Sequence, residues 1–266
     1  MITANKAAVT RFKKSAEEKT MSSSVTKKSA LVVSAHSADF VWRAGGAIAL
    51  HNAQGYDVHI VCLSFGERGE SAKLWRKGNM TEEKVKAARR EEAMAAADIL
   101  GASVEFFDLG DYPLRADKEA LFRLADVYRR VQPHFVLTHS MQDPYNYDHP
   151  LASNLAQEAR IIAQAEGYRP GEKVVEAPPV YCFEPHQPEQ CNWKPDVLLD
   201  ITSVWDKKYQ AIQCMQGQEH LWEYYTRVAL QRGVQAKRNI GITGSRVITH
   251  AEGFMSIFPR VTEELA

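Results

Sequence analysis

Short apolar runs alternate with longer amphipathic segments along most of the chain. The first run, which includes Val32 and Val33, stops at His36, and a helical pattern over residues 42–54 follows and ends at Gly55. A short run of β-branched residues is typical of a buried strand, and glycine after a periodic segment is typical of a helix C-terminus. The ordered part of the chain is therefore predicted to open with a strand and a helix.

The same alternation continues to about residue 167. Thr81 is a good N-cap for the longest helical pattern, and Gly101 closes it. The repeated order of strand and helix predicts an α/β fold, with a Rossmann-like, mostly parallel sheet that carries helices on both faces. The further strands are expected at Val58–Leu63, Val104–Phe107 and Phe135–Thr138, and the further helices at 82–100, 117–130 and 151–166.

Proline-rich loops change the character of the chain from about residue 168. Around them we expect short strands at Val180–Glu184 and Val197–Ile201, helices over 204–215 and about 221–238, and a last apolar segment near 254–258. This pattern predicts a smaller C-terminal α+β part within one domain of residues 29–266. Residues 1–28 are rich in Lys, Ser, Thr and Glu, which predicts a disordered N-terminal tail.

Composition narrows the classes of function. The 33 basic and 33 acidic residues cancel, so net charge favours neither nucleic acid nor an anionic membrane as a partner. The four cysteines show no C-x-x-C spacing, and no stretch approaches the ~20 apolar residues of a membrane span. We therefore expect a cytoplasmic protein that acts on a small molecule.

Three candidate metal ligands stand directly after predicted strands. His36 and Asp39 follow the opening strand, and His149 precedes the helix that comes after Phe135–Thr138. Because the carboxyl ends of parallel strands meet at one edge of a sheet, these side chains are predicted to converge. Imidazole and carboxylate are ligands that suit zinc. A glycine-hinged polar loop over residues 64–71 follows the second strand and is a further site candidate.

These residues resemble the motifs of the LmbE-like, or PIG-L, zinc deacetylase family. The Ala-His-Pro-Asp-Asp-Glu motif of that family stands here as residues 35–40, Ala-His-Ser-Ala-Asp-Phe. The resemblance implies an LmbE-like fold and a zinc ion held by His36, Asp39 and His149. It also implies that Asp148 orients a ligand or its helix. The likeness continues through residues 64–69, 89–101, 148–149 and 195–202.

Two positions depart from that family. Ala38 occupies the place of its general base, and Asn146 occupies the place of a histidine three positions before the last ligand. Deacetylation requires a base near the metal-bound water and a donor to the tetrahedral oxyanion. These two departures argue against an ordinary deacetylase.

Within the superfamily, the chain is similar to hydratases of bacterial gallate breakdown, through residues 65–77, 143–149 and 183–189. The resemblance implies a zinc-dependent hydro-lyase that adds water to 4-oxalomesaconate and gives 4-carboxy-4-hydroxy-2-oxoadipate. It also implies a homo-oligomer. Two alternatives stay open: an N-deacetylase of an N-acetyl sugar or thiol conjugate with a relocated base, and a zinc-binding assembly subunit without activity.

Since Ala38 cannot act as a base, an acid and a base must come from other side chains. Glu70 and His186, each in a polar loop after a strand, are the predicted acid–base pair, and either order of roles stays open. Glu67 is the nearest competitor. The remaining histidines are expected to be structural or at the surface: His51, His59, His134, His139, His220 and His250.

A tricarboxylate substrate requires local positive charge in a protein without net charge. Arginine is well suited to bind carboxylates in a bidentate manner. Arg43 and Arg68 are the preferred candidates because they flank the motifs, and Asn146 and Tyr145 are candidates for hydrogen bonds to the substrate. The other basic residues of this group are Lys73, Arg76 and Lys77.

Overall fold

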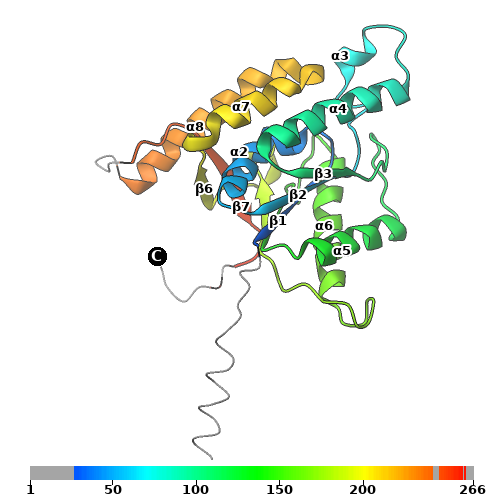
Figure 1. The fold of residues 1–266 in the computed structure, drawn as a ribbon. Helices are drawn as coiled ribbons and strands as arrows, with labels where there is room; N and C mark the ends of the chain where they lie inside the picture. The colour runs from blue at the N-terminus through cyan, green and yellow to red at the C-terminus, as the bar shows by residue number, and fades with distance from the viewer. Residues whose placement is uncertain (1–26, 242–245, 260, 262–266) are drawn as a thin grey trace, which may run out of the picture.

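A computed structural model describes residues 27–241, 246–259 and 261 of the chain. Most of the predicted N-terminal tail therefore lies outside the described residues. The centre is a seven-stranded sheet with the order β3-β2-β1-β4-β5-β7-β6 (Figure 1). Its strands are β1 (Ser29–Ser34), β2 (Asp57–Cys62), β3 (Ser103–Phe106), β4 (Phe135–Thr138), β5 (Val180–Phe183), β6 (Val197–Asp200) and β7 (Ala251–Ser256).

The first five strands are mutually parallel, and β7 runs antiparallel to both of its neighbours, β5 and β6. The predicted mostly parallel α/β sheet is therefore confirmed. The residues beyond 168 add three strands to the same sheet. The last strand begins at Ala251, three residues before the apolar segment near 254–258 that marked it in the sequence.

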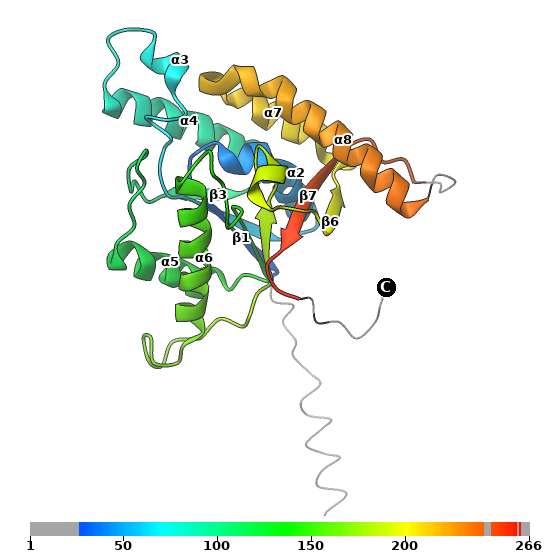
Figure 2. The same ribbon diagram turned by 180° about the vertical axis from the view of Figure 1, so that it is seen from behind.

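Helices cover both faces of the sheet (Figures 1 and 2). One apolar core lies under α2, α4, α7 and α8, and a second lies under α5 and α6, so the prediction of helices on both faces is confirmed. The helices are α2 (Asp39–Ala53), α3 (Ala72–Trp75), α4 (Glu82–Leu100), α5 (Lys118–Val131), α6 (Asp148–Gln164), α7 (Trp205–Cys214) and α8 (Trp222–Ile240). Short 3₁₀ helices occupy Pro188–Cys191, Thr202–Val204 and Gln216–Leu221.

Two helices begin earlier than the sequence pattern indicated. α2 begins at Asp39 rather than 42, and α6 begins at Asp148 rather than 151. Neither has a side-chain cap at its N-terminus, whereas Thr81 caps α4 by accepting a hydrogen bond from the amide of Lys84. Because no side-chain cap marks these two N-termini, the sequence pattern indicates each helix start three residues too far along the chain. The candidate ligands after β1 and β4 therefore belong partly to rigid first turns of helices.

The order of the strands defines the edge at which a site is expected. β1 lies between β2 and β4. The chain adds β2 and β3 on one side of β1, and then adds β4 and β5 on its other side. In open α/β sheets, ligands bind beyond the carboxyl ends of the strands at such a reversal. The loops after β1, β2, β4 and β5 meet at this edge.

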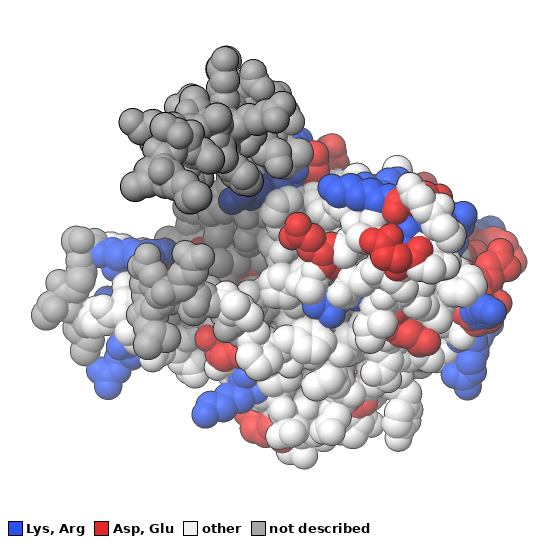
Figure 3. Space-filling view, turned by 90° about the horizontal axis from the view of Figure 1, so that it is seen from below, with Lys and Arg blue, Asp and Glu red and all other residues white. Residues whose placement is uncertain are grey.

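Surface charge is mixed on the face that Figure 3 shows, where lysine and arginine side chains are interspersed with aspartate and glutamate. This agrees with a formal net charge of zero. None of the described helices is both long and apolar enough to cross a membrane.

A buried ion pair joins α7 to β7, and both of its side chains hydrogen-bond to the backbone of α2. The Lys208 Nζ atom donates to Glu252 Oε1 at 2.6 Å and to the Trp42 carbonyl at 3.0 Å. The Glu252 carboxylate also accepts hydrogen bonds from the amides of Gly46 and Ala47, both at 2.7 Å. This carboxylate therefore fixes the position of α2, which supplies part of the site.

We expect Glu252→Ala to lower the free energy of unfolding by about 3–5 kcal/mol, because Lys208 would stay buried without its counter-charge. Urea unfolding followed by circular dichroism measures the change. Glu223→Ala is the matched control, since Glu223 pairs with Arg227 at the surface and both side chains are 75% exposed. Surface pairs contribute little. Equal small effects of the two substitutions would contradict the expectation.

Candidate metal centre and active site

His36 follows β1, is fully buried and lies among four carboxylates. Its Nδ1 atom is 3.1 Å from Asp39 Oδ2 and 3.2 Å from Glu70 Oε1. Its Nε2 atom is 3.2 Å from Asp111 Oδ1 and 3.4 Å from Asp148 Oδ2. Burial by itself would lower the pKa of His36, but the carboxylates, Glu70 first, outweigh it and raise this pKa well above its ordinary value. Such an excess of negative charge suits a bound cation.

His149 presents a free ligand atom to the same place. Its Nδ1 atom lies 2.8 Å from Asp143 Oδ2, and its Nε2 atom lies 3.6 Å from Asp39 Oδ1. Nε2 is buried and has no hydrogen-bond partner in the described part of the chain. Burial lowers the pKa of His149 to about 3, so the ring is neutral. An orphaned acceptor nitrogen with its other nitrogen on a carboxylate is the arrangement of a metal-binding histidine.

One ligand atom from each of His36, Asp39, Glu70 and His149 lies within 4.8 Å of the others, and we call these residues the donor group. The structure therefore brings the three sequence-predicted ligands together. It adds Glu70, a predicted catalytic residue, as a fourth neighbour of the same point. Nitrogen and oxygen donors in this number fit a zinc ion.

Asp111 holds the loop that carries Glu70. Its Oδ2 atom accepts hydrogen bonds from the amides of Arg68 at 2.6 Å and Gly69 at 2.8 Å. Gly66 has a φ of +68°, which favours glycine in this loop. The Glu70 side chain is mostly buried, and its Oε2 atom has no partner among the described residues. The loop thus places Glu70 Oε1 3.2 Å from His36 Nδ1 and leaves Oε2 buried and unpaired beside it.

His186 lies in the loop after β5 and stacks on an aromatic residue of α8. Its ring centroid is 4.2 Å from that of Tyr224, with an interplanar angle of 7°. The Tyr224 hydroxyl also donates to the His186 carbonyl at 2.7 Å. Burial, and next the charge of Arg43, lowers the pKa of the His186 imidazole. The ring is therefore held in one orientation by α8.

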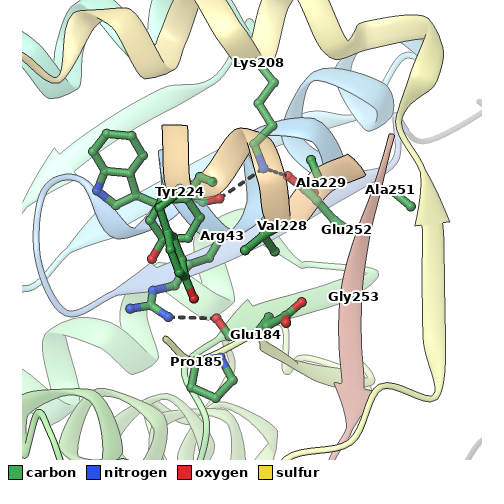
Figure 4. A pocket seen from close by; sticks show the side chains of 12 residues that line it. Arg43, Glu184, Pro185, Lys208, Tyr224, Val228, Ala229, Ala251, Glu252 and Gly253 are labelled. Carbon is green, nitrogen blue, oxygen red and sulfur yellow. Dashed lines mark hydrogen bonds and ion pairs between the residues drawn. The ribbon is translucent and has the colours of Figure 1, made fainter. Parts of the chain in front are cut away.

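The predicted substrate-binding residues have different surroundings. The Arg43 guanidinium is buried, and its Nε atom donates a hydrogen bond to Asp39 Oδ1 at 3.3 Å. Its Nη1 atom donates to the Glu184 carbonyl at 2.7 Å (Figure 4). The Arg68 side chain is about half exposed and pairs with Glu82 of α4 at 3.2 Å. The Asn146 Oδ1 atom accepts a hydrogen bond from the Asp148 amide at 3.1 Å, and so helps to start α6. Of the three, Arg43 alone has a side chain that hydrogen-bonds to a donor-group side chain, whereas Asn146 accepts a hydrogen bond from the His149 amide through its carbonyl at 3.3 Å.

Three residues near the site were not selected from the sequence. Asp111 follows β3 and Asp143 follows β4, so the rule that polar residues gather at carboxyl strand ends points to both. His139 was expected to be structural. It stacks on His149 with ring centroids 4.2 Å apart, and its Nε2 atom accepts a hydrogen bond from the Ala35 amide at 2.9 Å.

The chain is similar to proteins of one known family. The family model described as GlcNAc-PI de-N-acetylase, PIG-L, matches residues 31–160. A 4-oxalmesaconate hydratase of Pseudomonas putida is 83% identical over 240 residues, which are 90% of this chain and 93% of that protein.

Solved structures extend the comparison. The crystal structure of GalB, the 4-carboxy-2-hydroxymuconate hydratase of Pseudomonas putida, is 84% identical, with a TM-score of 0.89 over 90% of this chain and 100% of that chain. An N,N'-diacetylchitobiose deacetylase of Pyrococcus horikoshii shares the fold at 21% identity, with a TM-score of 0.69 over 97% of this chain and 94% of that chain. From these matches we conclude that the chain belongs to the PIG-L, or LmbE-like, family.

Proposed function

We propose that the protein is a zinc-dependent hydro-lyase that adds water across the double bond of 4-oxalomesaconate to give 4-carboxy-4-hydroxy-2-oxoadipate. The observation that carries the proposal is the 83% identity with a 4-oxalmesaconate hydratase over most of both chains. The site is consistent with it, because Ala38 leaves no carboxylate at the position of the deacetylase base. Deacetylation is therefore the disfavoured alternative.

His36, Asp39 and His149 would hold the zinc ion. When bound there, zinc supplies a Lewis acid for the enolate charge that develops during hydration of a conjugated keto acid. Arg43, buried beside Asp39, would bind a substrate carboxylate. Arg68 and Asn146 remain weaker candidates for substrate contact, since both are engaged elsewhere.

Glu70 and His186 would move the protons. Hydration takes a proton from water and delivers one to carbon, so it uses one base and one acid. Glu70 is in the loop after β2 and His186 is in the loop after β5, while the metal ligands follow β1 and β4, which lie between those strands. This order supports an acid and a base that act from opposite sides of the substrate.

The deciding experiment follows the ultraviolet absorbance of 4-oxalomesaconate. Hydration removes the conjugated double bond, so the proposal expects loss of absorbance, arrest after chelation and recovery when zinc is added back. Release of acetate from an N-acetyl sugar or thiol conjugate, with no loss of absorbance, would favour the deacetylase. Neither activity would favour an assembly subunit.

The proposal also covers the metabolic pathway, the cellular compartment and the oligomeric state. The reaction belongs to gallate-type aromatic breakdown in the cytoplasm, with a tricarboxylate as substrate and a homo-oligomer as the working form. Light scattering on the purified protein measures its mass, and a mass of one chain would contradict the assembly.

Zinc binding at pH 6.5 is expected to release about one proton. The carboxylates raise the pKa of His36 well above 6.5, so the metal-free protein carries a proton there that a metal ion must displace. The release should shrink, and zinc affinity should rise, as pH increases through the pKa of His36. Calorimetry in buffers of different ionisation enthalpy measures it. Binding without proton release would contradict the raised pKa.

A further inference from the structure

Tyr112 lies beside the donor group, next to Asp111 in the loop after β3, and has no role among the predicted metal ligands or in the acid–base pair. Its ring covers Gly69, where an added Cβ atom would come within 2.2 Å of Tyr112 Cε2. The ring also meets His36 edge-on, with centroids 6.0 Å apart and an interplanar angle of 79°. The phenol therefore lies over the loop that carries Glu70, next to a predicted metal ligand.

The backbone of Tyr112 is held in this position against its own preference. Its φ is +38°, which is uncommon for a residue other than glycine. The Tyr112 amide donates to Asp148 Oδ2 at 3.2 Å, and the same oxygen faces His36. Strained residues persist where their surroundings impose the conformation, and they concentrate at functional sites.

The hydroxyl of Tyr112 is available as a donor. Tyr112 is 46% exposed, and its hydroxyl has no hydrogen-bond partner among the described residues. Burial, and next the negative charge of Glu70, raises the pKa of Tyr112 to about 12. The phenol therefore stays protonated at neutral pH and can donate a hydrogen bond without adding charge.

We propose that Tyr112 contacts the substrate and donates a hydrogen bond from its hydroxyl to a carboxylate or enolate oxygen. This inference rests on the proposed function for the identity of the substrate. A tricarboxylate offers more acceptor oxygens than Arg43 alone can satisfy. A fixed neutral donor beside the donor group supplies one more partner and stabilises developing negative charge.

The first test is Tyr112→Phe, which removes the hydroxyl and keeps the ring over Gly69. We expect kcat/KM to fall by about 10- to 100-fold, the effect of losing one hydrogen bond to a charged oxygen, with zinc content and melting temperature unchanged. Tyr147→Phe is the matched control, because Tyr147 is 83% exposed and should leave kcat/KM as it is. Wild-type kcat/KM in Tyr112→Phe would overturn the proposal.

Gly69→Ala tests the same contact by displacing the Tyr112 ring, with kcat/KM again as the measured quantity. Its φ is not in the positive range, so alanine fits the backbone, but the new Cβ atom would displace the Tyr112 ring. We expect Gly69→Ala to resemble Tyr112→Phe, and the double variant to lose little more than either single variant. If the losses in kcat/KM of the two single variants added fully in the double variant, Gly69→Ala would not act through the Tyr112 hydroxyl.

A binding assay separates this inference from the proposed reaction. Tricarballylate, a saturated tricarboxylate, is titrated into the zinc-loaded wild-type protein and Tyr112→Phe by calorimetry. Binding about 10-fold weaker in the variant would support the contact even if 4-oxalomesaconate were not hydrated, in which case only the proposed function would fail. Equal affinities, or no binding to the wild-type protein, would overturn the role of Tyr112.

Discussion

His149→Ala is expected to bind zinc at least about 100-fold more weakly and to lose nearly all hydration activity, since even loss of an outer partner of a ligand costs 10- to 100-fold. The Nε2 atom of His149 is buried, unprotonated and without a hydrogen-bond partner in the described structure. His149 and His36 supply the two nitrogen ligands of the donor group. Metal analysis after dialysis and the absorbance assay measure the two effects.

Two further variants show how large the loss of zinc affinity in His149→Ala is by comparison. Asp143→Asn would weaken the hydrogen bond that orients His149, so an intermediate loss of about 10- to 100-fold in zinc affinity is expected. His134→Ala is the control, because His134 is exposed and precedes β4 at the opposite edge of the sheet. Wild-type zinc affinity in His149→Ala would remove His149 from the metal site.

Glu70→Gln is expected to slow hydration by about 10²- to 10⁴-fold while the protein keeps its zinc, because a positioned acid or base contributes that much to proton transfer. The amide preserves the size of the side chain, and removes its negative charge and its ability to carry a proton. Steady-state rates between pH 5 and 9, with metal analysis of the same samples, measure the effect.

The outcome also separates two roles for Glu70. Loss of zinc together with rate would make Glu70 a metal ligand rather than an acid or base. His186→Gln should retain zinc and remove the opposite limb of the pH–rate profile. Glu67→Gln tests the competitor, whose buried carboxylate lies 3.7 Å from the Lys86 ammonium. If Glu67→Gln alone slowed the reaction, the assignment of Glu70 would be wrong.

The sheet was predictable because each of its parts has a local signal. β-Branched apolar runs mark the strands, and Thr81 and Gly101 mark the two ends of α4. The sequence pattern indicates the starts of α2 and α6 three residues late, because Ala38 and Tyr147 give no side-chain cap. The predicted ligands still converge, because they depend on the strand ends more than on the helix boundaries.

The surroundings of individual side chains were less predictable. Arg68 flanks a motif, yet its guanidinium pairs with Glu82, whereas Arg43 reaches Asp39 from one turn further along α2. Asp111 and Tyr112 come from the loop after β3, which is two strands away from β1 in the sheet. No spacing in the sequence brings this loop to His36.

The sequence by itself determined the α/β class, the strand ends that carry His36, Asp39 and His149, and the absence of a carboxylate at Ala38. These features follow from local periodicity and from the geometry that all parallel sheets share. Only the tertiary structure decided which charged groups surround His36, that Glu70 joins the ligands, and that Tyr112 covers Gly69. Such contacts join residues far apart in the chain, and packing in three dimensions selects them.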